Sequence, residues 1–168
     1  MTGWGKEGMM LRTMDFPNET RWHIATRALS RMIIAAGREA RERKEIPDAF
    51  YALGDEIGRI AGDHRMPRGN AGEIIQALGV ISVMLFGPAF ETPYIEGYSE
   101  EAVIRLTRCP LYSEEYREHA DPETIRAACC AYLVTAIEAL NPDFSLSVPF
   151  SRCAGEDFCE IIIERKPR

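Results

Sequence analysis

Residues 121–166 read DPETIRAACCAYLVTAIEALNPDFSLSVPFSRCAGEDFCEIIIERK, and this stretch decides the fold. It opens with Asp121-Pro122-Glu123, which supplies an N-cap acceptor, a proline suited to the first helical position and an acid for the helix dipole. Apolar residues then recur every three or four positions, the spacing of one helix face, as far as Asn141-Pro142. Because proline cannot continue the helical hydrogen bonds, the stretch predicts a long amphipathic helix that ends there.

The rest of the same stretch predicts a hairpin. Apolar residues alternate with serines from Phe144 to Ser151, which is the two-residue period of a half-buried strand. A turn bounded by two cysteines follows. The second strand then alternates apolar residues with glutamates: Cys159, Ile161 and Ile163 with Glu160 and Glu164.

Length and composition indicate one ordinary domain. A chain of 168 residues that is 46% hydrophobic can bury one good core, and its 27% of charged residues is typical of soluble proteins. The net charge of -6 argues against a nucleic-acid partner, because such binding needs a basic surface.

The sequence also bears on compartment and cysteine chemistry. No apolar run approaches the roughly 18 residues needed to cross a bilayer, and the first residues lack the apolar segment of a signal peptide. We therefore expect a cytoplasmic protein with no membrane partner. In that reducing compartment the five cysteines are expected to be thiols or metal ligands rather than disulfides.

Two helices are predicted near the N-terminus, after an arm formed by residues 1–17. Asn18 can cap the first, which extends to about residue 43, and Pro47-Asp48 restarts the chain into the second. Gly54 and Gly58 weaken the second helix, and the usual reason for such glycines is close approach of a neighbouring helix.

A third helix and a first hairpin are predicted next. Asn70 and Glu73 form a variant of the capping box for a helix that continues to about Phe86. This helix is apolar over most of its circumference, which indicates burial on more than one side. Alternation of apolar and polar residues then predicts a hairpin over about 94–108.

These elements predict a single α+β domain over residues 1–168, with an N-terminal arm (1–17), a helical part (18–86) and an α+β part (87–168). Two hairpins with helices on one face make a four-stranded antiparallel sheet, with the long helix placed before the C-terminal hairpin.

Four short motifs follow one another in the second half of the chain: Arg108-Cys109-Pro110 after a strand, Cys129-Cys130 on the long helix, Asn141-Pro142 at its end, and Gly155-Glu156-Asp157-Phe158-Cys159 in the hairpin. Together they resemble the family named for L-2-amino-thiazoline-4-carboxylic acid hydrolase, over about residues 85–165. That family belongs to a superfamily with the four-vinyl-reductase domain, a small-molecule-binding module, and the transport-particle subunits of vesicle tethering. The hairpin departs from the family pattern by placing Glu156 directly after the glycine.

The resemblance implies the fold and several possible functions. The leading hypothesis is a domain of the sensor or ligand-binding type that holds a small organic molecule near the cysteine hairpin. The alternative is a hydrolase that opens a cyclic C–N bond of the aminothiazoline kind. In that reaction a thiolate or a metal-bound water would attack the amidine carbon, and Asp157 or Glu156 would relay the proton.

A third possibility follows from the vesicle-tethering relatives, in which this fold serves as a dimeric structural block. The mainly apolar third helix needs a partner if the domain cannot cover it alone. We therefore expect a homodimer through the N-terminal helices, with twofold symmetry.

The cysteines are the candidate metal ligands. Cys153 and Cys159 flank a tight turn, and Cys109 at a strand end and Cys130 on the helix flank could complete a four-ligand zinc site. The alternative is that these residues fill core volume as small apolar side chains. Cys129 in particular lies in the middle of the apolar stripe.

A third hypothesis is that one of the cysteines acts as a nucleophile. Cys109 or Cys159 would be the nucleophile, and such a thiol needs a neighbouring base to lower its pKa. His119 is the better candidate for that base, and Asp157 is the candidate acid. No histidine adjoins a cysteine in the sequence, so the enzyme hypothesis ranks below the binding hypothesis.

Overall fold

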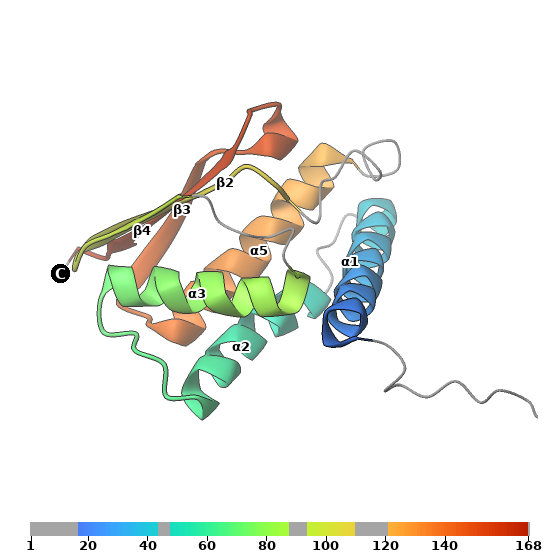
Figure 1. Cartoon of the computed structure of the whole chain (residues 1–168). Coiled ribbons are helices and arrows are strands. Elements are labelled where there is room, and N and C mark those ends of the chain that lie inside the picture. Colours follow the sequence, from blue (N-terminus) through green and yellow to red (C-terminus); the bar gives the residue numbers. More distant parts are fainter. Residues whose placement is uncertain (1–16, 44–47, 88–93, 110–120, 168) are drawn as a thin grey trace, which may run out of the picture.

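The computed structural model describes residues 17–43, 48–87, 94–109 and 121–167. The arm up to residue 16 and the segment 110–120, which contains His119, lie outside the described residues. In chain order the elements are helices α1 (Asn18–Arg43), α2 (Asp48–Asp63) and α3 (Ala71–Phe86), strands β1 (Tyr94–Gly97) and β2 (Glu101–Leu106), helix α5 (Pro122–Leu140), strand β3 (Phe144–Phe150), the 3-10 turn η3 (Arg152–Ala154) and strand β4 (Cys159–Arg165) (Figure 1).

Helix α5 begins and ends where its capping residues predict. The Asp121 carboxylate accepts hydrogen bonds from the backbone N–H of Thr124 at 3.0 Å and from its hydroxyl at 2.7 Å. At the other end the Asn141 N–H donates to the carbonyl of Ile137 at 2.8 Å. These caps therefore mark the two ends of the helix that crosses the centre of the molecule (Figure 1).

Helix α3 uses the predicted capping residues with one variation. The Asn70 side chain accepts a hydrogen bond from the Glu73 N–H at 2.9 Å, while the Glu73 carboxylate accepts one from the Gly69 N–H at 2.7 Å. The carboxylate thus reaches the residue before the cap rather than the cap itself. Nine residues of α3 are buried, but Val80 and Met84 remain half exposed on one flank.

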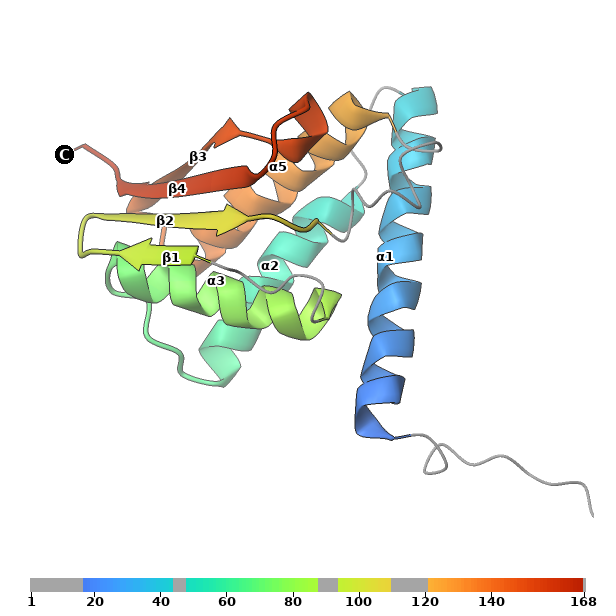
Figure 2. The same ribbon diagram turned by 45° about the horizontal axis from the view of Figure 1, so that its top comes forward.

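The strands form one antiparallel sheet in the order β1-β2-β4-β3. Each predicted hairpin pairs its own two strands, and the hairpins join where β2 lies beside β4 (Figure 2). In that pairing Ala102 lies opposite Ile163, and Leu106 lies opposite Cys159. The α+β class and the four-stranded antiparallel sheet predicted from the sequence are confirmed.

The helices cover one face of the sheet. In Figure 1, α3 and α5 lie against the strands, and α2 packs on α5 and α3. The glycines of α2 permit this close packing: a Cβ on Gly54 would lie 2.6 Å from the Cβ of Thr135 and 2.7 Å from the carbonyl oxygen of Tyr132. Helix α1 stands at one end of the molecule (Figure 2) and contacts α5, α3 and α2.

Among the described helices, none is both long enough and apolar enough to cross a membrane.

Candidate functional site

A cavity of about 40 Å³ lies between the first half of α5 and the end of the sheet where β2 finishes and β4 begins. Its lining is almost wholly apolar, and all five cysteines of the chain take part in it. The lining residues are Phe86, Leu106, Cys109, Ile125, Arg126, Cys129, Cys130, Tyr132, Leu133, Val148, Ser151, Cys153, Cys159 and Ile161.

The topology explains how thiols distant in sequence meet. Cys159 begins β4 and pairs with Leu106 at the end of β2, so Cys109, three residues further on, leaves the sheet at the same end. Cys153 lies in η3, the turn that joins β3 to β4. Helix α5, which packs against the sheet, supplies the two remaining cysteines, Cys129 and Cys130. The cysteines of both proposed sets, metal-binding and nucleophilic, are therefore gathered at one cavity.

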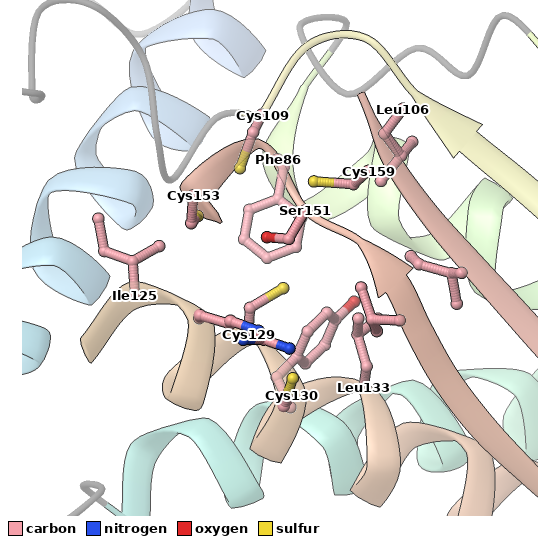
Figure 3. Close-up of a pocket in the computed structure, with 14 residues that line it drawn as sticks. Phe86, Leu106, Cys109, Ile125, Cys129, Cys130, Leu133, Ser151, Cys153 and Cys159 are labelled. Atoms are coloured by element: carbon pink, nitrogen blue, oxygen red, sulfur yellow. The ribbon is translucent and has the colours of Figure 1, made fainter. Parts of the chain in front are cut away.

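Figure 3 distinguishes the two adjacent cysteines of α5. The sulfurs of Cys109, Cys153 and Cys159 lie around the ring of Phe86, and the sulfur of Cys129 points toward the same space from the helix. The sulfur of Cys130 points to the other side, near Leu133. Sequence reasoning chose Cys130 for the metal set, whereas Cys129 is the member of the pair that faces the other thiols.

Burial keeps several of these thiols protonated. It raises the pKa of Cys129 well above its ordinary value, and the neighbouring cysteines, Cys109 first, raise it further. Burial, with a smaller contribution from Cys159, raises the pKa of Cys153 to about 11. The pKa of Cys130 is also raised by burial, against the opposing effect of the Arg126 guanidinium. At neutral pH these three groups are apolar S–H side chains.

Cys159 has a polar contact that the sequence did not reveal. The backbone N–H of Arg152 donates to the sulfur of Cys159 at 3.3 Å. The Arg152 guanidinium in turn donates to the carbonyl oxygen of Thr107 at 2.6 Å and so ties η3 to the chain just after β2. Main-chain donors carry no sequence signature, so only the three-dimensional arrangement identifies this contact.

Phe86 and Tyr132 form the aromatic part of the lining. Their rings meet edge to face with centroids 5.9 Å apart, and the Tyr132 hydroxyl forms a buried hydrogen bond of 3.0 Å with the Ser82 hydroxyl. Burial raises the pKa of Tyr132, so its hydroxyl stays neutral. The Tyr132 hydroxyl therefore has its hydrogen-bond partner between the helices, and the ring presents an apolar surface to the cavity.

None of the predicted acids and bases is found among the residues that line the cavity in the described part of the chain. Glu156 and Asp157 are exposed at the tip of the β3–β4 hairpin and are not part of the lining. His119 lies outside the described residues. The hydrolase hypothesis, with its acid and base, stays a prediction.

Zinc binding also stays a prediction. Within residues 17–43, 48–87, 94–109 and 121–167, no three Cys, His, Asp or Glu side chains are arranged as a group that could hold a metal ion. A thiol must lose its proton to bind zinc, and the raised pKa values of Cys129 and Cys153 oppose that loss.

Comparison with known proteins gives a fold and no family. No protein-family model matches the sequence, and no significant relative is found among curated proteins. Among solved structures, the chain is similar to trafficking protein particle complex subunit 3 from Naegleria fowleri, a structure covalently bound to palmitic acid. The TM-score is 0.58 at 12% sequence identity, over 86% of this chain and 96% of that chain. The likeness shows a shared fold.

Proposed function

We propose that this chain is a ligand-binding domain that holds a small apolar organic molecule in the cysteine-lined cavity. The observation that carries the proposal is the lining itself, in which aromatic, aliphatic and protonated thiol side chains surround the space and polar groups are few. Sites for small organic molecules are typically concave and mainly apolar, with a small number of polar groups that set orientation.

The size of the cavity limits the ligand. A space of about 40 Å³ accommodates a few water-sized groups, far less than the roughly 300–1,000 Å³ of drug-sized pockets. A short aliphatic group of a few heavy atoms therefore fits with little rearrangement, whereas a cavity that binds benzene measures about 150 Å³. The similar trafficking subunit carries palmitic acid, which supports an apolar ligand for this fold. A chain of that length would require side chains such as Phe86 to move.

Binding of trifluoromethane, a probe of four heavy atoms, followed by fluorine NMR, tests the proposal. We expect saturable binding to the wild-type protein and its loss in Val148→Trp, because Val148 lines the cavity and the larger side chain fills it. Val134→Trp is the matched control, since Val134 is 42% exposed on α5 and is not part of the lining. Near-ultraviolet circular dichroism checks that both variants fold. Equal binding by the two variants, or no binding by the wild type, would reject the cavity as the site.

A second function, that of a dimeric interaction domain, is favoured by an exposed apolar patch. We define the patch by Trp22 of α1 and by Val80 and Met84 of α3, which are 37%, 51% and 51% exposed. The Trp22 indole N–H donates to the Met84 carbonyl at 2.9 Å and so holds the two helices together there. The similar solved structure is, by its name, a subunit of a complex, and we propose that this patch forms a twofold homodimer contact.

Light scattering tests the dimer. We expect the wild-type protein at micromolar concentration to have twice the 18.9 kDa mass of one chain, because burial of the patch removes apolar surface from water. Val80→Glu should reduce the mass to that of one chain, and Val134→Glu, an equivalent change at an exposed position of α5, should not. A wild-type mass of one chain would contradict the dimer.

A further inference from the structure

We propose that Cys159 is the reactive thiol of the cavity and forms covalent adducts with neutral, apolar, soft electrophiles such as α,β-unsaturated carbonyl compounds. The proposal rests on the proposed function, since it assigns a chemistry to the same cavity. Two observations select this residue: its position at the start of β4, where it lines the cavity, and the backbone donor aimed at its sulfur.

The donor supplies electrostatic support at the atom that reacts. The Arg152 N–H lies 3.3 Å from the Cys159 sulfur, within hydrogen-bonding range for sulfur. A fixed N–H dipole stabilises the negative charge that sulfur carries as it attacks carbon. The contact between the Arg152 guanidinium and the Thr107 carbonyl holds the donor in place, so little reorganisation is needed when charge develops.

Three of the other four thiols are disfavoured as nucleophiles. Ser151 and the Cys153 main chain hydrogen-bond the Cys153 sulfur, but burial outweighs them, and a pKa of about 11 lowers the thiolate fraction at neutral pH about 100-fold relative to an ordinary thiol of pKa near 9. Burial also raises the pKa of Cys129 and of Cys130, and the sulfur of Cys130 points away from the other four (Figure 3). Cys109 remains as the competitor, and the experiment must separate it from Cys159.

The lining selects the electrophile. Almost all of it is apolar and Arg126 is the one charged side chain among the described residues that form it, so an anionic reagent would lose most of its hydration on entry, while a neutral enone has little to lose. In the addition, the S–H bond and the C=C π bond break, and the S–C bond forms at the β-carbon. The thiol proton is taken up at the α-carbon through solvent. The atoms balance without an oxidant, a reductant or a leaving group.

Limited labelling of the native wild-type protein with N-ethylmaleimide, a neutral α,β-unsaturated imide, tests the assignment. The reaction is quenched at early times, the protein is digested, and mass spectrometry quantifies each cysteine peptide. We expect Cys159 to be labelled at least about tenfold faster than each of the other four. In strong denaturant the five rates should converge. Fastest labelling at Cys109 or at a cysteine of α5, or equal labelling of all five, would overturn the proposal.

Charge selectivity and a matched pair of variants extend the test. Neutral iodoacetamide should label Cys159 at least about tenfold faster than anionic iodoacetate does, after correction for their rates with a free thiol. Cys159→Ser should abolish the fast phase with N-ethylmaleimide, and Cys130→Ser should retain it. If Cys159→Ser retained the fast phase, that phase would belong to another cysteine and the proposal would be overturned. The mapping on wild-type protein stands even if one variant fails to fold.

The outcome can be separated from that of the proposed function. If the wild type binds trifluoromethane but is labelled fastest at another cysteine, the reactive-thiol proposal fails and the binding function stands. If Cys159 is labelled fastest but no trifluoromethane binds, the thiol assignment holds and the apolar-ligand function fails.

Discussion

At the scale of single residues, the hydrogen bond between Ser82 and Tyr132 shows how a buried polar pair can be tested. Ser82 is fully buried, Tyr132 is 2% exposed, and their hydroxyls are 3.0 Å apart. We expect Tyr132→Phe and Ser82→Ala each to lower the free energy of unfolding by about 1–3 kcal/mol, because each change leaves the other hydroxyl buried without this partner. Urea denaturation of each variant measures both values.

The double variant decides whether the two hydroxyls act as a pair. Once the phenol oxygen is absent, removing the serine hydroxyl strands no partner, so the double variant should cost less than the sum of the single ones by about 0.5–1.5 kcal/mol. Strict additivity would show that the hydrogen bond contributes nothing to stability.

At the level of residues, sequence reasoning assigned the cysteines to their elements but could not distinguish between the two adjacent cysteines of α5. Short motifs placed cysteines on a strand end, a helix and a hairpin turn, and the structure puts all five around one cavity. Choosing between Cys129 and Cys130 requires the rotation of α5 about its axis to within a fraction of a turn. Tertiary packing sets that rotation, and the apolar periodicity of α5 defines it only broadly.

At the scale of elements, the glycines of α2 make a prediction about helix packing. Gly54 faces α5 at a point where an added Cβ would lie 2.7 Å from the carbonyl oxygen of Tyr132, which is main chain and cannot rotate away. We expect Gly54→Ala to lower the free energy of unfolding by about 1–3 kcal/mol through overpacking, despite the better helix propensity of alanine. Thermal and urea denaturation measure the change.

Gly62 near the end of the same helix is the control. A Cβ there would meet only the tip of the Arg68 side chain, at 4.0 Å. Gly62→Ala should therefore be neutral or stabilising by up to about 1 kcal/mol. If both alanine variants gained stability, the close approach of α2 and α5 would be refuted.

Prediction of the elements from sequence worked where the signals are local. Capping residues such as Asp121 and Asn70 correctly predicted where helices begin, and the alternation of apolar and polar residues correctly predicted the strands. The pairing of β2 with β4 had no such signal, because the partners are separated by more than fifty residues and any buried strand would complement either of them. The third helix was predicted to be buried on more than one side, and the structure adds that Val80 and Met84 stay exposed.

At the scale of the whole molecule, fold and function follow from the sequence to different degrees. The order and type of the elements were enough to predict the α+β class, because two hairpins with helices on one face can be arranged in only a few ways. The cavity was not predictable in size or lining, since both depend on where β2, β4 and α5 converge. The similar trafficking subunit shows that the same fold persists at 12% identity, so the fold alone does not determine the function of this chain.

The strand order has a consequence for how the chain is made on the ribosome. Strand β4 lies inside the sheet although it is the last of these four strands to be synthesised, and β3 pairs with β4 alone. Until residues 159–165 have emerged, β1 and β2 are a two-stranded hairpin supported by α3 but not by the rest of the sheet, and β3 has no strand beside it. The helices are synthesised earlier. The apolar face that β4 covers in the finished fold therefore stays uncovered while tens of further residues are translated. For the nascent chain, the arrival of β4 closes the sheet and brings Cys159 to the other thiols in one late event.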